Sequence, residues 1–135
     1  MGYGKGELFY KEGIVFKSND SVDEKGRRPT VVPIATTDDN RFVYVLSLTS
    51  QVDRYFEFRE AEEQYYLLKK DDVNNLRKTS LVNLMDIYKF RLFEPIKPAF
   101  GHLKTDDYVK MIEKFKFCQK FYPDEDYWDE IKHKI

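Results

Sequence analysis

The chain has 135 residues, 35% of them charged, and its formal net charge is −1 at pH 7. Because positive and negative residues nearly balance, the net charge gives no evidence for a nucleic-acid partner. A site for RNA or DNA must therefore be a local basic patch. The single cysteine, Cys118, excludes an intramolecular disulfide framework and is typical of a reducing compartment. We expect one domain over residues 1–135, located in the cytoplasm, with no signal peptide and no membrane-spanning segment.

The N-terminal part contains one predicted strand between two polar or glycine-rich stretches. Residues 1–10 combine glycines with aromatic residues, and we interpret them as a loosely held arm. Residues 11–16 have the composition of a short first strand. The polar stretch 18–26 is predicted to be a loop, and loops on rigid sheets often carry binding residues.

Two apolar runs then flank a cluster of turn-forming residues at 36–40, which predicts a β-hairpin over 29–50. Alternation places one set of return-strand residues on one face, Phe42, Tyr44, Leu46 and Leu48, and another set on the opposite face, Val43, Val45, Ser47 and Thr49. Pro33 lies inside the first strand and cannot donate a ladder hydrogen bond. We therefore expect an edge strand or a bulge there.

An antiparallel hairpin brings its two open ends together, and here those ends carry complementary chemistry. Arg27 and Arg28 precede the first strand, while Ser47, Thr49 and Ser50 end the return strand. A guanidinium beside hydroxyls is well suited to hold a phosphodiester. The alternative, an exposed arginine pair next to ordinary strand residues, stays open from the hairpin alone.

The middle of the chain continues with short strands. Residues 65–68 form a predicted strand, 71–75 have turn chemistry, and 79–93 contain strand material that is broken near Asn83 and Asp86. Many short strands followed by one helix predict a mainly β (α+β) fold. We expect a small curled antiparallel sheet or barrel with a helix packed against it.

The predicted helix covers about 105–121, with Thr105 as its N-cap and an apolar stripe that we interpret as core. Pro123 separates this helix from an acidic segment, 124–135. That segment has two interpretations. It is either a solvated tail with a short helical turn and one aromatic residue tucked back, or a local regulator of a basic groove.

Several familiar catalytic patterns are not found in the sequence. His102 and His133 are isolated, no Cys/His cluster has zinc-site spacing, and no phosphate-binding glycine loop is present. We therefore expect no metal site and no cofactor. If the protein is an enzyme, arginine and hydroxyl groups must carry the reaction.

Five stretches, taken in this order along the chain, resemble the MazF/PemK family of toxin endoribonucleases. They are GIVF at 13–16, RPTVV at 28–32, LSLTS at 46–50, SLVNL at 80–84 with Ile87, and GHL at 101–103 before the helix. The resemblance implies a small SH3-like antiparallel β-barrel with a C-terminal helix, over a core of 11–121 followed by a tail at 122–135. It also implies a homodimer that cuts single-stranded RNA without metal and is restrained by a cognate protein antitoxin.

Carried over by position, Arg28 matches the catalytic arginine of that family and Thr49 its catalytic hydroxyl, with Ser50 in support. A further set is expected to contact RNA: Lys25, Arg27, Ser47, Gln51 and Asn83. The chain departs from the family at Ile14, where an acidic residue is usual. This departure keeps open a non-catalytic RNA- or protein-binding module on the same barrel. A separate alternative is a related toxin that is inhibited by an RNA antitoxin, because such toxins also use a Thr-Ser strand end.

Overall fold

The computed structural model describes residues 4–11, 29–50, 61–92 and 98–135. The strands in these ranges are β1 (Glu7–Tyr10), β2 (Thr30–Thr36), β3 (Phe42–Thr49), β4 (Tyr65–Leu68), β5 (Ser80–Asn83), β6 (Tyr88–Arg91) and β7 (Gly101–His102). The helices are α2 (Ala61–Gln64), α3 (Thr105–Phe121) and α4 (Trp128–Ile131). No helix in the described ranges is both long enough and apolar enough to cross a membrane.

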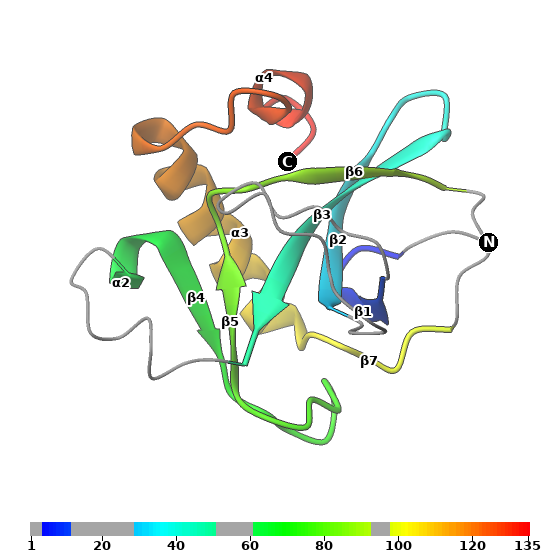
Figure 1. The fold of residues 1–135 in the computed structure, drawn as a ribbon, viewed down its shortest axis with the longest axis vertical. Helices are drawn as coiled ribbons and strands as arrows, with labels where there is room; N and C mark the ends of the chain where they lie inside the picture. The colour runs from blue at the N-terminus through cyan, green and yellow to red at the C-terminus, as the bar shows by residue number, and fades with distance from the viewer. Residues whose placement is uncertain (1–3, 12–28, 51–60, 93–97) are drawn as a thin grey trace.

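Within the described residues, seven antiparallel strands form one curled, half-barrel sheet, in the order β4-β5-β3-β2-β1-β7, with β6 also paired to β3 (Figure 1). Both β5 and β6 pair with β3: β5 pairs with its C-terminal end and β6 with its N-terminal half. Residues 84–87 separate β5 from β6, so the two strands pair with different parts of β3. The predicted mainly β fold with a C-terminal helix is confirmed.

The β2–β3 hairpin is also confirmed, and its register pairs Thr30 with Leu48 at the open end. The register shifts between Pro33 and Ala35, so the proline sits next to a bulge. The strand itself is not an edge, because β2 lies between β1 and β3. Proline has no backbone N–H to donate, and a bulge lets a central strand contain such a residue.

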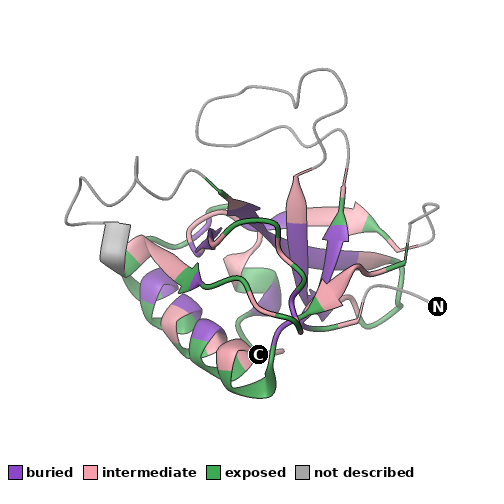
Figure 2. Ribbon diagram, turned by 90° about the horizontal axis from the view of Figure 1, so that it is seen from below, coloured by how far each residue is buried: buried purple, intermediate pink, exposed green. Residues whose placement is uncertain are grey.

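Strand β3 is buried on both faces, and its alternation separates two apolar clusters. In Figure 2 the buried residues, in purple, gather in the strands of the sheet. One face contributes Tyr44, Leu46 and Leu48 to the large cluster shared with α3. The opposite face contributes Val43 and Val45 to a smaller cluster, together with Phe9, Val31 and Tyr88. The predicted division of β3 into two faces is therefore correct, and both faces are packed.

The interpretation of residues 1–10 as a loose arm is wrong for β1. Leu8 and Phe9 are buried, and β1 is hydrogen-bonded to β2 on one side and β7 on the other. Pairing on both sides satisfies the backbone polar groups of this strand, so its apolar side chains can enter the core. The first strand predicted over 11–16 lies, apart from Lys11, outside the described residues.

Helix α3 begins at the predicted residue, but Thr105 is not its N-cap. Lys104 occupies the cap position without a side-chain capping bond, and its carbonyl accepts a hydrogen bond from the backbone N–H of Tyr108 at 2.9 Å. The predicted apolar stripe is core: the buried residues of α3 are Met111, Phe115, Cys118 and Gln119. Burial raises the pKa of the Cys118 thiol to about 11, so this thiol is protonated and unreactive at neutral pH.

The acidic segment after Pro123 is part of the packed structure, so the expectation of a solvated tail is wrong. Ile131 is fully buried, and the Trp128 ring meets Phe115 edge to face at a centroid distance of 5.6 Å. Tyr127 makes a similar contact with Tyr44 at 5.9 Å. The segment packs despite its charge, because its acidic residues other than Asp124 are exposed while the rings and Ile131 reach the core.

Candidate nucleic-acid interface

The predicted catalytic hydroxyls stand at the open end of the hairpin. Thr49 is the last residue of β3, is half-buried and pairs with Leu81 of β5, and Ser50 follows it in an exposed position. Ser47 is buried, opposite Val31 of β2. The other residues predicted at this end, Lys25, Arg27, Arg28 and Gln51, lie outside the described residues. Their approach to Thr49 and Ser50 stays a prediction.

Asn83 lies at the other end of β5 from Ser80 and forms part of a turn. Its side-chain oxygen accepts hydrogen bonds from the backbone N–H groups of Met85 and Asp86, at 2.9 and 3.3 Å. Its amide nitrogen donates to the Asp86 carboxylate at 3.1 Å. This is the bonding of an asparagine that ends a strand. The structure does not bring Asn83 into the hollow that contains Ser50, and its predicted contact with RNA stays untested.

A hollow of about 240 Å³ opens beside Ser50, and we call it the Ser50 hollow. Its lining comes from the open hairpin end, the end of β1, the β4–β5 loop and the residue before β7: Tyr10, Thr30, Ser50, Leu76, Arg77, Lys78, Ser80 and Phe100. In Figure 1 this region lies at the lower end of the sheet, where the β3 arrowhead, β1, β7 and the β4–β5 loop converge. It combines cations, hydroxyls and aromatic rings.

The β4–β5 loop that carries Arg77 and Lys78 is held by a dense set of hydrogen bonds. Asp71 accepts from the N–H groups of Val73 and Asn74, both at 2.8 Å. The buried Asn74 side chain accepts from the N–H groups of Asp71 and Leu76 and donates to the carbonyl of Lys69. These bonds satisfy the backbone of a turn locally, so the loop presents its two cations from a fixed base.

The same loop is fastened to β7 by a close backbone approach. The backbone N–H of His102 donates to the carbonyl of Val73 at 3.1 Å, and the side chain of Asn75 donates to the carbonyl of Phe100 at 2.9 Å. A Cβ atom on Gly101 would overlap the backbone carbonyl of Asn74. Glycine at this position is therefore what permits the approach that closes the hollow.

Arg77 and Lys78 are exposed, and within the described ranges no salt bridge involves either of them. Opposite them, the rings of Tyr10 and Phe100 stack at a centroid distance of 4.4 Å and an interplanar angle of 21°. Tyr10 remains 37% exposed. Among the described residues, the hollow thus offers two cations without an ion-pair partner, next to a partly exposed aromatic pair.

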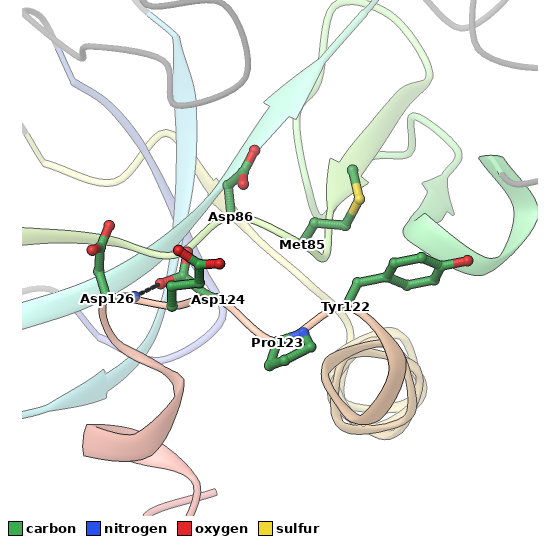
Figure 3. Close-up of a pocket in the computed structure, with 7 residues that line it drawn as sticks. Met85, Asp86, Tyr122, Pro123, Asp124 and Asp126 are labelled. Carbon is green, nitrogen blue, oxygen red and sulfur yellow. Dashed lines mark hydrogen bonds between the residues drawn. The ribbon is translucent and has the colours of Figure 1, made fainter.

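A second hollow, of about 470 Å³, contains acidic residues but serves the fold (Figure 3). Asp124 lines it and accepts hydrogen bonds from the backbone N–H groups of Ile87, Asp126 and Tyr127, at 3.0, 3.0 and 2.9 Å. Gln119 donates to the carbonyls of Leu84 and Met85 and accepts from the N–H of Asp124. We call this pair of residues, with the backbone of 84–87, the Asp124 joint.

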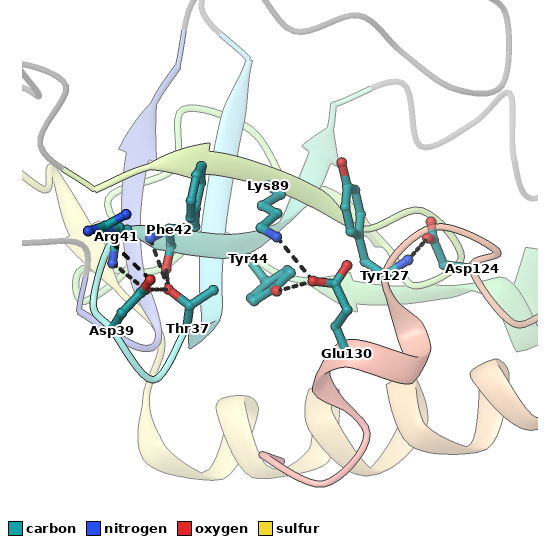
Figure 4. A network of polar contacts seen from close by, with 9 residues as sticks. All are labelled: Thr37, Asp39, Arg41, Phe42, Tyr44, Lys89, Asp124, Tyr127 and Glu130. Atoms are coloured by element: carbon teal, nitrogen blue, oxygen red, sulfur yellow. Dashed lines mark hydrogen bonds and ion pairs between the residues drawn. The ribbon is translucent and has the colours of Figure 1, made fainter.

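A third polar cluster ties α4 to the sheet (Figure 4). The Glu130 carboxylate accepts from the Tyr44 hydroxyl at 2.9 Å and from Lys89 at 3.0 Å. The Lys89 ammonium also lies over the rings of Phe42, Tyr44 and Tyr127, at 4.9, 5.3 and 5.7 Å. Burial acts to raise the pKa of Glu130, but the hydrogen bonds and charge of Lys89 and Tyr44 outweigh it and lower that pKa.

Among the described residues, no group of three or more His, Cys, Asp or Glu side chains could hold a metal ion. Compared with known proteins, the chain matches no protein-family model and no curated protein. The likeness to MazF/PemK toxins therefore remains one of motifs and their order.

The sequence prediction missed most of the lining of the Ser50 hollow. Arg77 and Lys78 form a basic pair directly after the turn at 71–75, and this is the same signal that drew attention to Arg27 and Arg28. Tyr10 could not be assigned because residues 1–10 were interpreted as an arm. Its place beside Thr30 follows from the pairing of β1 with β2, which only the tertiary structure establishes.

Proposed function

We propose that this protein is an endoribonuclease that cuts single-stranded RNA without a metal ion, as the toxin of a toxin–antitoxin system. The observation that supports the proposal most is the Ser50 hollow. It places the hydroxyls of Ser50 and Thr30 beside Arg77 and Lys78, at the strand end where Thr49 stands. Cations and hydroxyls on a rigid sheet end are the groups expected to hold a phosphodiester.

In the proposed reaction the RNA supplies its own nucleophile. The 2′-oxygen attacks the adjacent phosphorus and loses its proton, the bond from phosphorus to the 5′-oxygen breaks, and the leaving oxygen takes up a proton. The products are a 2′,3′-cyclic phosphate and a 5′-hydroxyl. Attack within one nucleotide is unimolecular and gains from proximity. Thr49, supported by Ser50, would orient the phosphate, and Arg28 would stabilise the charge that develops on its oxygens.

The test is a gel assay of a labelled single-stranded RNA in EDTA, with wild type, Arg28→Ala and Arg28→Lys. We expect wild type to cut and both variants to fail, because an ammonium does not reproduce the planar, two-pronged grip of a guanidinium. A substrate with one 2′-deoxy nucleotide 5′ of the cut site should resist cleavage at that bond only. Cleavage at the 2′-deoxy position would contradict the proposal. Failure of wild type to cut unmodified RNA in EDTA would contradict it as well.

In this proposal the toxin acts in the cytoplasm, in line with its single cysteine. The homodimer and the cognate protein antitoxin are proposed because the resemblance implies them. One feature of the hollow favours a second candidate function, RNA binding without cutting. Its described lining contains neither a carboxylate nor an imidazole, the groups that most often transfer protons in enzymes. The gel assay separates the two candidates, since a binding module would leave the RNA intact.

A further inference from the structure

We infer that the Ser50 hollow is a subsite for one unpaired nucleotide of the RNA beside the bond that is cut. The base of this nucleotide would lie against the Tyr10–Phe100 pair, and its phosphate would contact Arg77 and Lys78. The inference rests on the proposed function for the identity of the ligand as RNA. It assigns binding roles to four residues, none of which belongs to the predicted catalytic set.

The size of the hollow fits part of a polymer better than a free small molecule. Its volume is about 240 Å³. Pockets that enclose drug-sized ligands usually have about 300–1,000 Å³. A smaller hollow, open to solvent and next to the predicted reaction site, suits a single nucleotide whose chain continues on both sides.

The aromatic side of the hollow is built to receive a flat ring. Tyr10 and Phe100 are already stacked, and the backbone N–H of Phe100 donates to the carbonyl of Leu8 at 3.0 Å, which fixes the second ring to β1. Tyr10 is 37% exposed, so a base can reach this pair from solvent and stack on it. Bases in a duplex are already stacked on their neighbours, so the surface favours single strands and tolerates any base.

The charged side of the hollow offers an arginine and a lysine on adjacent positions of the rigid β4–β5 loop. Their positive charges have no salt-bridge partner within the described ranges, so a phosphate does not have to displace one there. A guanidinium can hold two phosphate oxygens at once, and an ammonium adds a mobile point charge. Thr30 and Ser50 line the same hollow and supply hydroxyl groups as neutral donors.

The experiment measures binding separately from cutting. The probe is a fluorescein-labelled 12-nucleotide single strand of randomised sequence, with 2′-O-methyl groups throughout, which removes the nucleophile. Its Kd is measured by anisotropy in EDTA at several salt concentrations. The variants are Arg77→Ala, Lys78→Ala and Tyr10→Leu, with Phe100→Leu as a second test of the aromatic pair. Lys70→Ala is the matched control, because Lys70 is an exposed cation of the same loop that does not line the hollow.

Variants of the two cations and variants of the aromatic pair should change the Kd and its salt dependence in different ways. Arg77→Ala and Lys78→Ala should each weaken binding about fivefold at 0.1 M salt and reduce the salt slope by about 0.7, the value for one lost phosphate contact on a single strand. Tyr10→Leu should weaken binding about tenfold without changing the slope, because stacking carries no net charge. Lys70→Ala should match wild type in Kd and slope. Thermal melting by circular dichroism checks that each variant is folded.

Three results would overturn the subsite: wild type that does not bind the probe, cation variants with an unchanged salt slope, or aromatic variants with an unchanged Kd. If wild type still cuts RNA in any of these cases, the proposed function stands and only the subsite fails. If the variants behave as expected but wild type leaves unmodified RNA intact, the subsite stands and the proposed cleavage fails.

Discussion

The Asp124 joint and the Ser50 hollow both concentrate polar side chains where strands of the sheet end, but these side chains have opposite roles. At the joint, the buried Gln119 and Asp124 side chains are bonded to backbone groups of the break between β5 and β6 and of the segment after α3. At the hollow, Arg77 and Lys78 are exposed, on a loop whose turn is closed by hydrogen bonds of Asp71 and Asn74.

Burial and hydrogen bonding separate structural from functional polar residues in this chain. A buried polar group must be bonded, and its removal leaves its partners unsatisfied in a dry environment. An exposed cation on a rigid loop contributes little to stability, so its role has to be sought in binding. In the sequence, the cluster of carboxylates in the acidic segment resembles a binding site more than Arg77 and Lys78 do. In the structure, the Asp124 carboxylate is bonded to three backbone N–H groups of the fold.

The largest expected effect on stability is at the joint. Asp124→Ala removes the acceptor for three backbone N–H groups, so the free energy of unfolding should fall by about 2–4 kcal/mol. Urea denaturation followed by circular dichroism measures the change. Glu125→Ala is the matched control, since Glu125 is exposed and lines the same hollow, and it should change stability by less than about 0.5 kcal/mol. Equal effects of the two variants would remove the distinction.

The next largest effect concerns the reaction at the other region. Thr49→Ala should slow RNA cutting by about 100-fold or more, comparable to the loss of one donor to a developing oxyanion. Single-turnover cleavage of a labelled RNA gives the rate. Thr36→Ala, at the opposite end of the hairpin, is the control and should cut at the wild-type rate. A Thr49→Ala enzyme with normal activity would rule out the proposed role of this hydroxyl.

A smaller, pH-dependent effect is expected where Glu130 joins α4 to the sheet. The pKa of Glu130 is lower in the folded protein than the usual value of about 4.3. Its contribution to stability is therefore present above that value and disappears as the pH falls through the folded pKa. Because the side chain is 43% exposed, Glu130→Gln should cost only about 0.5–1 kcal/mol at pH 7.

Chemical denaturation of wild type and Glu130→Gln at pH 7 and at pH 3 tests this expectation. The two proteins should differ at pH 7, and the difference should shrink as the pH falls, because protonation removes the charge of the wild-type carboxylate. A difference that stays constant over this range would mean that packing of the side chain, and not its charge, holds α4.

The smallest effect on stability is expected for Arg77→Ala, and it sharpens the comparison with Asp124→Ala. Arg77 is exposed and makes no ion pair within the described ranges, so the free energy of unfolding should change by less than about 0.5 kcal/mol. The measurement is the same urea titration. A loss of about 2 kcal/mol or more would show that Arg77 stabilises the loop, and its role would then be structural.

The sequence by itself determined the elements whose signals are local. The turn residues at 36–40 and 71–75, the alternation along β3 and the helical spacing of α3 each depend on neighbours a few residues apart. The same holds for the break near Asn83, where the asparagine bonds to the next turn. Propensity and periodicity are sufficient in these cases, because the interactions that form the element lie inside it.

Only the tertiary structure decided which distant segments share a site. Tyr10 meets Phe100 because β1 pairs with β7, and Arg77 lies beside Ser50 because β5 pairs with β3. The acidic segment packs against the sheet because the Asp124 carboxylate accepts a hydrogen bond from the backbone N–H of Ile87, which lies 37 residues earlier in the chain. Such partners follow from sheet register and from the need to bond every buried polar group, and neither has a local signature in the sequence.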